Sequence, residues 1–81
     1  MAKRLQEIIK TKSGKEVYLT STELKILEEL MKGLFNYEVA ENLSVSVRTI
    51  ENHRHSMMKK LESRNAIELT ITAIKLGIVK I

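Results

Sequence analysis

Residues 36–54 read NYEVAENLSVSVRTIENHR, and this stretch decides the fold that the sequence predicts. Asn36 is a good N-cap for a short helix over residues 37–43, whose apolar residues fall on one side. Ser44-Val45 forms a brief turn, and Ser46 then caps a longer helix that runs to about residue 62. A short helix, a tight turn and a longer basic helix are the outline of a helix-turn-helix.

The helix predicted over residues 46–62 has two different faces when successive side chains are placed about 100° apart. One face fits a core, and the opposite face carries long side chains that donate and accept hydrogen bonds, as reading base edges in a major groove requires. A solvated helix of a protein-interaction module shows the same pattern, so periodicity alone leaves both interpretations open. The apolar face holds Val47, Ile50, Met57, Met58 and Leu61, and the polar face holds Arg48, Glu51, Asn52, His55, Lys59 and Glu62.

Helix-capping signals predict further helices on both sides of this stretch. Thr20 and Glu23 fit a capping box, and Gly33 is placed to end the helix that the box begins. Asn65 is expected to cap a last helix that ends at Gly77. The fold class is therefore all-α, a small bundle of four core helices that contains a helix-turn-helix.

The N-terminal part is predicted less directly. Apolar residues at positions 5, 8 and 9 have the i, i+3, i+4 spacing of a short helix, followed by a turn at residues 11–14 and an extended stretch at residues 15–19. The alternative is a linker to something missing. We divide the chain into an N-terminal segment or linker, residues 1–18, and a helix-turn-helix domain, residues 19–81.

The composition excludes several classes of function. A chain of 81 residues is one domain, and without cysteine it has no disulfide, thiolate nucleophile or Cys-ligated zinc. It also lacks aspartate, a histidine paired with a nucleophile, and a glycine-rich phosphate loop, so we expect no enzyme activity, cofactor or small-molecule ligand. His53 and His55 point about 160° apart on a helix and lack a third ligand, so we expect no metal site.

The distribution of charge is more informative than its total of +4. Residues 1–16 and 46–64 each carry a net charge of +3, whereas residues 17–45 carry −3. A basic stretch after an acidic one suggests one polarised face and a nucleic-acid partner. No apolar run approaches the ~20 residues of a membrane span, and we expect a cytoplasmic protein with no membrane partner.

An ordered series of motifs resembles the LuxR/FixJ-type DNA-binding domain, over residues 19–79. That resemblance implies four helices, the third in the major groove and the fourth paired with a symmetry mate. It further implies a transcription regulator, often the output domain of a two-component response regulator. The motifs are Leu19-Thr20-Ser21-Thr22-Glu23, Leu27, Gly33, Asn36-Tyr37-Glu38-Val39-Ala40, Leu43, Ser44-Val45-Ser46, Thr49-Ile50-Glu51-Asn52-His53-Arg54, Lys60-Leu61, Arg64-Asn65 and Leu76-Gly77-Ile78.

The resemblance also implies which side chains contact DNA. Three positions depart from the family pattern: Tyr37 stands where lysine is common, Thr22 where arginine is common, and Glu51 matches the subset with glutamate, which changes the preferred base sequence. An ion pair at the core edge is the alternative role for Arg54. The expected base readers are Arg48, Glu51, Asn52 and His55, and the expected backbone contacts are Tyr37, Ser46, Thr49, Arg54 and Lys59.

The last predicted helix has two apolar faces about 140° apart, whereas a peripheral helix of a small domain needs only one. We expect the second face to pair with another copy of the chain, in solution or only on DNA; the alternative is that the N-terminal segment covers it. The expected partners are thus double-stranded DNA, a second copy and RNA polymerase, and the rival class is an interaction module that docks an acidic partner. One face holds Ile67, Ile71 and Ile74, and the expected dimerisation face holds Ala66, Leu69, Ala73 and Leu76.

Overall fold

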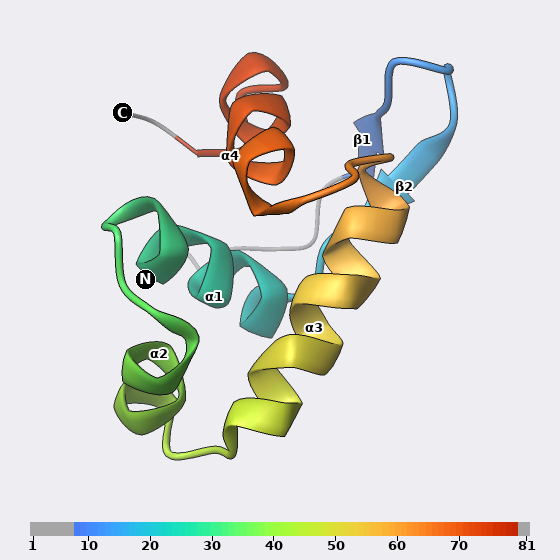
Figure 1. Ribbon diagram of the computed structural model, residues 1–81. Coiled ribbons are helices and arrows are strands. Elements are labelled where there is room, and N and C mark those ends of the chain that lie inside the picture. Colours follow the sequence, from blue (N-terminus) through green and yellow to red (C-terminus); the bar gives the residue numbers. More distant parts are fainter. Residues whose placement is uncertain (1–7, 80–81) are drawn as a thin grey trace, which may run out of the picture.

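The computed structural model describes residues 8–79, and Figure 1 shows the four predicted helices in this part of the chain. The all-α bundle with a helix-turn-helix is confirmed, with one addition, a two-stranded hairpin before the helices. The elements are β1 (Ile8–Lys10), β2 (Glu16–Tyr18), α1 (Ser21–Met31), α2 (Asn36–Leu43), α3 (Val47–Lys60) and α4 (Ala66–Lys75).

The hairpin corrects the prediction of a short N-terminal helix. Ile8–Lys10 is a strand, antiparallel to Glu16–Tyr18, with Ile9 opposite Val17. The predicted turn is confirmed, because the Thr11 N–H donates to the Lys15 carbonyl at 2.9 Å and returns the chain. The apolar spacing that suggested a helix included position 5, which lies outside the described residues, so strand pairing decides the conformation of Ile8–Lys10.

Side chains near the helix ends fix where α1 and α4 begin. The Glu23 N–H donates to Thr20 Oγ1 at 3.1 Å and Glu23 Oε1 accepts from the Thr20 N–H at 2.9 Å, which confirms the capping box. The Glu68 N–H donates to Asn65 Oδ1 at 2.9 Å. Gly77 has a φ of +73°, and its left-handed conformation ends α4 as predicted.

Helix α2 begins one residue earlier than predicted. Phe35 is the N-cap, and Asn36 is the first helical residue. The Phe35 ring has no hydrogen-bond acceptor, so only half of a capping box forms: Glu38 Oε1 accepts from the Phe35 N–H at 2.8 Å. The prediction of Asn36 as N-cap was wrong: Phe35 occupies the N-cap, and the Glu38 carboxylate binds its N–H.

The core lies where α3 meets α1, α2 and α4, and it includes the inner side of the hairpin through Val17. Ile50 and Met57 of α3 have no exposed surface. The division of the chain at residue 18 stays a prediction. Among residues 8–79, no helix is long and apolar enough to cross a membrane. Fully buried side chains are Leu19, Ile26, Leu27, Val39, Ile50, Met57 and Leu69.

Candidate nucleic-acid interface

A tight turn fixes α2 against α3. Ser44 adopts a left-handed conformation with φ +58°, and the Val45 N–H donates back to the Ala40 carbonyl at 3.0 Å. Ser46 then begins α3, because its Oγ accepts from the Thr49 N–H at 3.1 Å. The turn between the two helices therefore spans only residues 44–46, and α2 packs along the first half of α3 (Figure 1).

An ion pair fixes the second half of α3 to α1. Lys60 Nζ lies 2.7 Å from Glu23 Oε1, and the Glu23 side chain is only 4% exposed. Burial raises the pKa of the Glu23 carboxyl, but the hydrogen bonds from Lys60 and from the Thr20 N–H lower it, and the net shift is downward. Glu23 is therefore ionised at neutral pH, and α3 has a fixed orientation on the scaffold.

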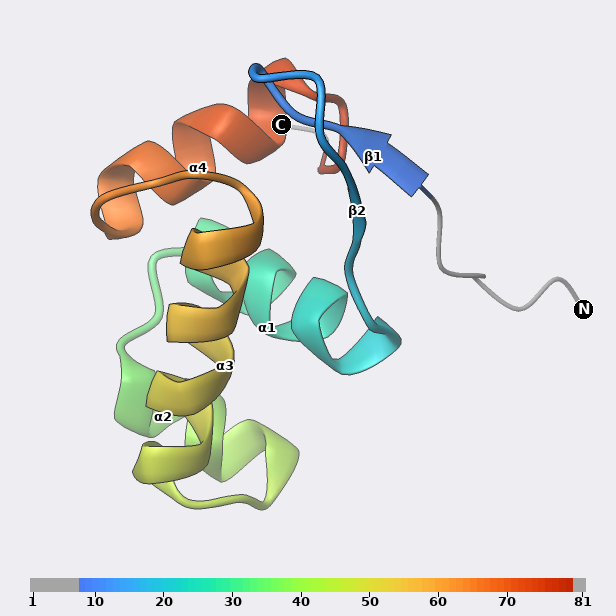
Figure 2. The same ribbon diagram turned by 90° about the vertical axis from the view of Figure 1, so that its right-hand side faces the viewer.

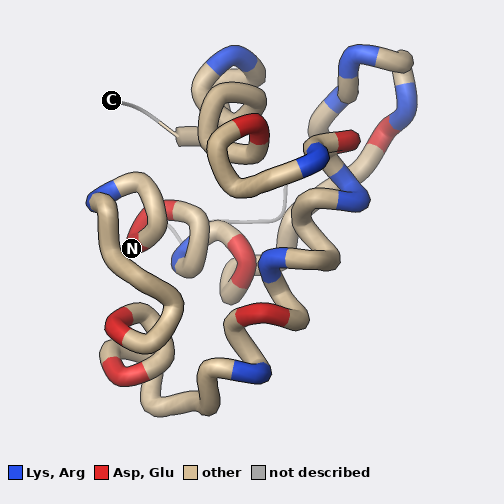
Figure 3. The backbone as a smooth tube through the Cα atoms, viewed as in Figure 1, with Lys and Arg blue, Asp and Glu red and all other residues tan. Residues whose placement is uncertain are grey.

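The outward face of α3 carries all four predicted base readers. Arg48, Glu51, Asn52 and His55 are exposed along one side of the helix, opposite the buried Ile50. None of the four forms a hydrogen bond or an ion pair with another side chain of residues 8–79. Basic positions predominate along α3, where Glu51 is the one acidic residue (Figure 3). This face is thus free to contact another molecule.

The predicted backbone contacts lie around this face. Ser46 and Thr49 are in the first turn of α3, and exposed Lys59 is in its last turn. Arg54 is half-buried, and its Nε has no hydrogen-bond partner in the described part of the chain, so the ion pair considered for it is absent there. An unpaired buried donor is costly, and an anion near the guanidinium would compensate for it once the side chain turned outward.

An exposed aromatic pair marks the start of α2, and sequence reasoning named only one of its members. The rings of Phe35 and Tyr37 stack with centroids 5.8 Å apart and an angle of 8° between their planes. Both are more than 60% exposed. The sequence could have indicated Phe35 as a second exposed aromatic, because it is an apolar residue directly before a capped helix and two positions before Tyr37.

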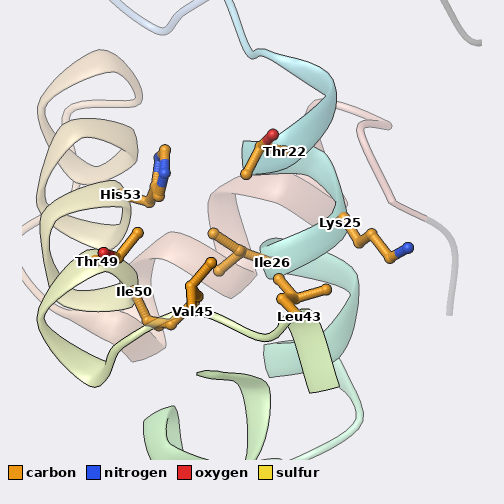
Figure 4. Close-up of a pocket in the computed structure, with 8 residues that line it drawn as sticks. All are labelled: Thr22, Lys25, Ile26, Leu43, Val45, Thr49, Ile50 and His53. Atoms are coloured by element: carbon orange, nitrogen blue, oxygen red, sulfur yellow. The ribbon is translucent and has the colours of Figure 1, made fainter. Parts of the chain in front are cut away.

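A groove separates α1 from α3 beside the turn (Figure 4). His53 and Thr49 of α3 line one side, and Thr22 and Ile26 of α1 line the other. His53 is half-buried there, and its ring forms no hydrogen bond within residues 8–79.

The dimerisation face predicted for α4 is wrong for two of its four residues. Leu69 and Ala73 have no exposed surface and belong to the core, so neither can contact a second chain in this conformation. Ala66 and Leu76 are half-buried. The other apolar face points outward instead, with Ile67 72% and Ile71 46% exposed. The sequence showed two apolar faces but not which of them packs against α1 and α3.

Comparison with known protein families identifies the family of this chain. The profile of bacterial regulatory proteins of the luxR family matches residues 17–73, which include all four helices except the end of α4. The chain belongs to the luxR family. The helix-turn-helix of α2 and α3 is therefore that of a luxR-family DNA-binding domain.

Similar proteins agree with this assignment. The luxR-family chain is 38% identical over 72 residues to the uncharacterized response regulatory protein YgeK of Escherichia coli, covering 89% of this chain and 49% of YgeK. It is 44% identical over 57 residues to the oxygen regulatory protein NreC of Staphylococcus carnosus, covering 70% of this chain and 26% of NreC. The luxR-family chain thus spans half or less of the length of these relatives.

A solved structure supports the fold. Full-length FixJ from B. japonicum superposes on the luxR-family chain with a TM-score of 0.65 and 32% sequence identity. The match covers 76% of this chain and 30% of the FixJ chain.

Proposed function

We propose that this domain recognises a specific sequence of double-stranded DNA by placing α3 in the major groove. The observation that carries the proposal is the outward face of α3, where long polar side chains have no side-chain partner among residues 8–79. Donors and acceptors held on a rigid helix can pair with base edges without first breaking internal bonds. Arg48 offers donors suited to guanine, Asn52 can pair with adenine, and Glu51 can accept from cytosine.

The proposed backbone contacts surround this face. Ser46, Thr49 and the free N–H groups of the first turn of α3 form a favourable site for a phosphate. Lys59 supplies a cation near the other end of the helix, and Arg54 reaches a phosphate if its side chain turns outward. Tyr37, held by its stacking on Phe35, presents a hydroxyl at the start of α2.

We also propose that the domain binds as a homodimer through the outer face of α4. Ile67 and Ile71 are one helical turn apart and exposed, and two such residues on each copy form a self-complementary patch. A two-fold dimer would read two half-sites about one helical turn apart, ~34 Å. As a bacterial regulator it would act in the cytoplasm, with RNA polymerase as a further candidate partner.

A titration with duplex DNA of random sequence at low salt tests the proposal first. We expect binding at micromolar protein that weakens steeply with salt, because phosphate contacts release counterions. If micromolar protein does not bind, the polar face docks another class of partner, such as an acidic protein.

Asn52→Ala tests the reading face. We expect the variant to lose about 1–3 kcal/mol of binding to the selected site and to tolerate any base at one position. Selection from random duplexes followed by fluorescence titration measures both effects. The matched control is Asn42→Ala, an exposed asparagine on α2 whose side chain bonds Glu29 Oε1 at 2.8 Å. If Asn52→Ala kept the wild-type base preference, a different surface of the domain would read the bases.

Ile71→Glu tests the dimer. We expect it to abolish cooperative binding to paired half-sites, because two like charges would face each other across the two-fold axis. Affinity for a duplex that carries a single half-site should stay the same, which serves as the internal control. Gel shifts on duplexes with one and two half-sites separate the outcomes. Retained cooperativity would exclude this face of α4.

A further inference from the structure

The β-hairpin lies beside the C-terminal end of α3. Ser13 at the hairpin tip donates to Glu62 Oε2 at 2.5 Å, just after α3 ends. At its base the hairpin is held by Val17, which is buried in the core. Figure 2 shows the hairpin and α3 on the same side of the molecule. The luxR profile begins at Val17, within β2, so β1 and the hairpin turn lie before the part of the chain that it matches.

Lysines gather at the tip of the hairpin (Figure 3). Lys12 and Lys15 flank Gly14, and both are exposed. Neither forms an ion pair with a side chain of residues 8–79. Lys10 on β1 lies opposite Glu16 on β2, so its charge is partly offset. The two tip lysines therefore carry the unpaired charge of the hairpin.

The turn holds these lysines in a defined place. Thr11 is buried, and its Oγ1 accepts from the Lys15 N–H at 3.2 Å. Two acidic side chains on this side of the molecule bind other groups: Glu62 accepts from the Ser13 hydroxyl, and Glu68 pairs with Arg64 at 2.6 Å. The hydrogen bonds from Arg64 lower the pKa of Glu68 to about 2, with a smaller contribution from the charge of Lys12. Lys12 is thus near α4 as well as α3, but it remains without an ion-pair partner there.

We propose that the hairpin is a second DNA-contacting element, with Lys12 and Lys15 bound to phosphates that flank the groove occupied by α3. The inference rests on the proposed function of α3. A helix of 14 residues is about 21 Å long, whereas the major groove is about 12 Å wide. The C-terminal end of α3 and the adjoining hairpin therefore extend beyond the groove, to where the phosphate backbone lies.

The double variant Lys12→Gln/Lys15→Gln tests this inference. Its matched control is Lys25→Gln/Lys75→Gln, which removes the same charge from exposed lysines of α1 and α4. Binding to duplex DNA is titrated between 50 and 200 mM salt, and the fold of each variant is checked by circular dichroism. Each phosphate contact contributes about 0.9 to the slope of log affinity against log salt.

We expect the hairpin variant to have a slope shallower by about 1.8, with its base preference unchanged. Over the same salt range the wild type would lose about 10-fold more affinity than the variant. A duplex trimmed to the bases under α3 should bind the wild type and the hairpin variant equally, because it lacks the flanking phosphates. The control variant should keep the wild-type slope.

Three results would overturn the inference while leaving the proposed function intact. The first is a hairpin variant that keeps the wild-type salt slope. The second is a control variant whose slope falls as much as that of the hairpin variant. The third is a difference in affinity between wild type and hairpin variant that persists on the trimmed duplex. If no protein binds any duplex, the proposed function itself fails. If the hairpin variant bound DNA like the wild type, we would infer that Lys12 and Lys15 bind a different acidic partner.

Discussion

Leu69→Glu is expected to leave the domain largely unfolded at 25 °C. Leu69 has no exposed surface, so the variant would bury a carboxylate with no cation beside it in the core. Burying an unpaired charge costs more than about 4 kcal/mol, and a domain of this size has a total stability of only about 4–12 kcal/mol. Circular dichroism should show loss of helix and no cooperative thermal transition.

The same substitution two residues earlier supplies the control. Ile67 lies on the same helix but is 72% exposed, so Ile67→Glu should change the free energy of unfolding by less than about 0.5 kcal/mol. Measurement in dilute protein keeps any self-association out of the comparison. If Leu69→Glu melted cooperatively near the wild-type temperature, the inner face of α4 would have been assigned incorrectly.

Lys60→Met is expected to reduce the free energy of unfolding at pH 7 by about 2–3 kcal/mol. The change leaves the Glu23 carboxylate buried without its cation, which is the costly way to break such a pair. The cost falls below that of a fully buried pair because the Lys60 side chain is 30% exposed. Urea denaturation measures the loss, and Lys60→Arg, which keeps the charge, should recover most of it.

The effect of Lys60→Met should depend on pH. In the wild type the pKa of Glu23 is below its ordinary value of 4.5, so the stabilisation is complete above about pH 4.5 and is lost as the pH falls through the lowered value. Without Lys60 the pKa of Glu23 should be higher than in the wild type, and protonation then relieves the cost of the buried charge. The difference between the two proteins should therefore shrink at pH 3; a constant difference would show that the charge of Glu23 is not its cause.

The sequence predicted the helices well because their ends are encoded locally. Thr20 and Glu23, three residues apart, form the full capping box, and Asn65 Oδ1 caps the Glu68 N–H, although the Glu68 carboxylate accepts from the Arg64 N–H instead of that of Asn65. The turn at Ser44 is likewise local. The outward face of α3 followed from the 3.6-residue period alone, since Ile50 had to face the core.

The errors arose where packing between distant segments decides the outcome. Two apolar faces of α4 were visible, but only its position against α1 and α3 shows that Leu69 is internal and Ile71 external. The hairpin depends on the pairing of Ile9 with Val17, eight residues away. The i, i+3, i+4 spacing that predicted a helix contains no information about this pairing. The pairing of Glu23 with Lys60 spans 37 residues and had no signal in local sequence.

The outward face of α3 has a consequence for how such a protein can change over evolution. Its exposed side chains form no bonds with other side chains in the described part of the domain, while Ile50 and Met57 on the opposite face form the core. Substitutions at Arg48 or Glu51 should therefore leave folding almost unaffected. A lineage could acquire a new operator by changing a few codons, without first accumulating compensating mutations elsewhere in the gene.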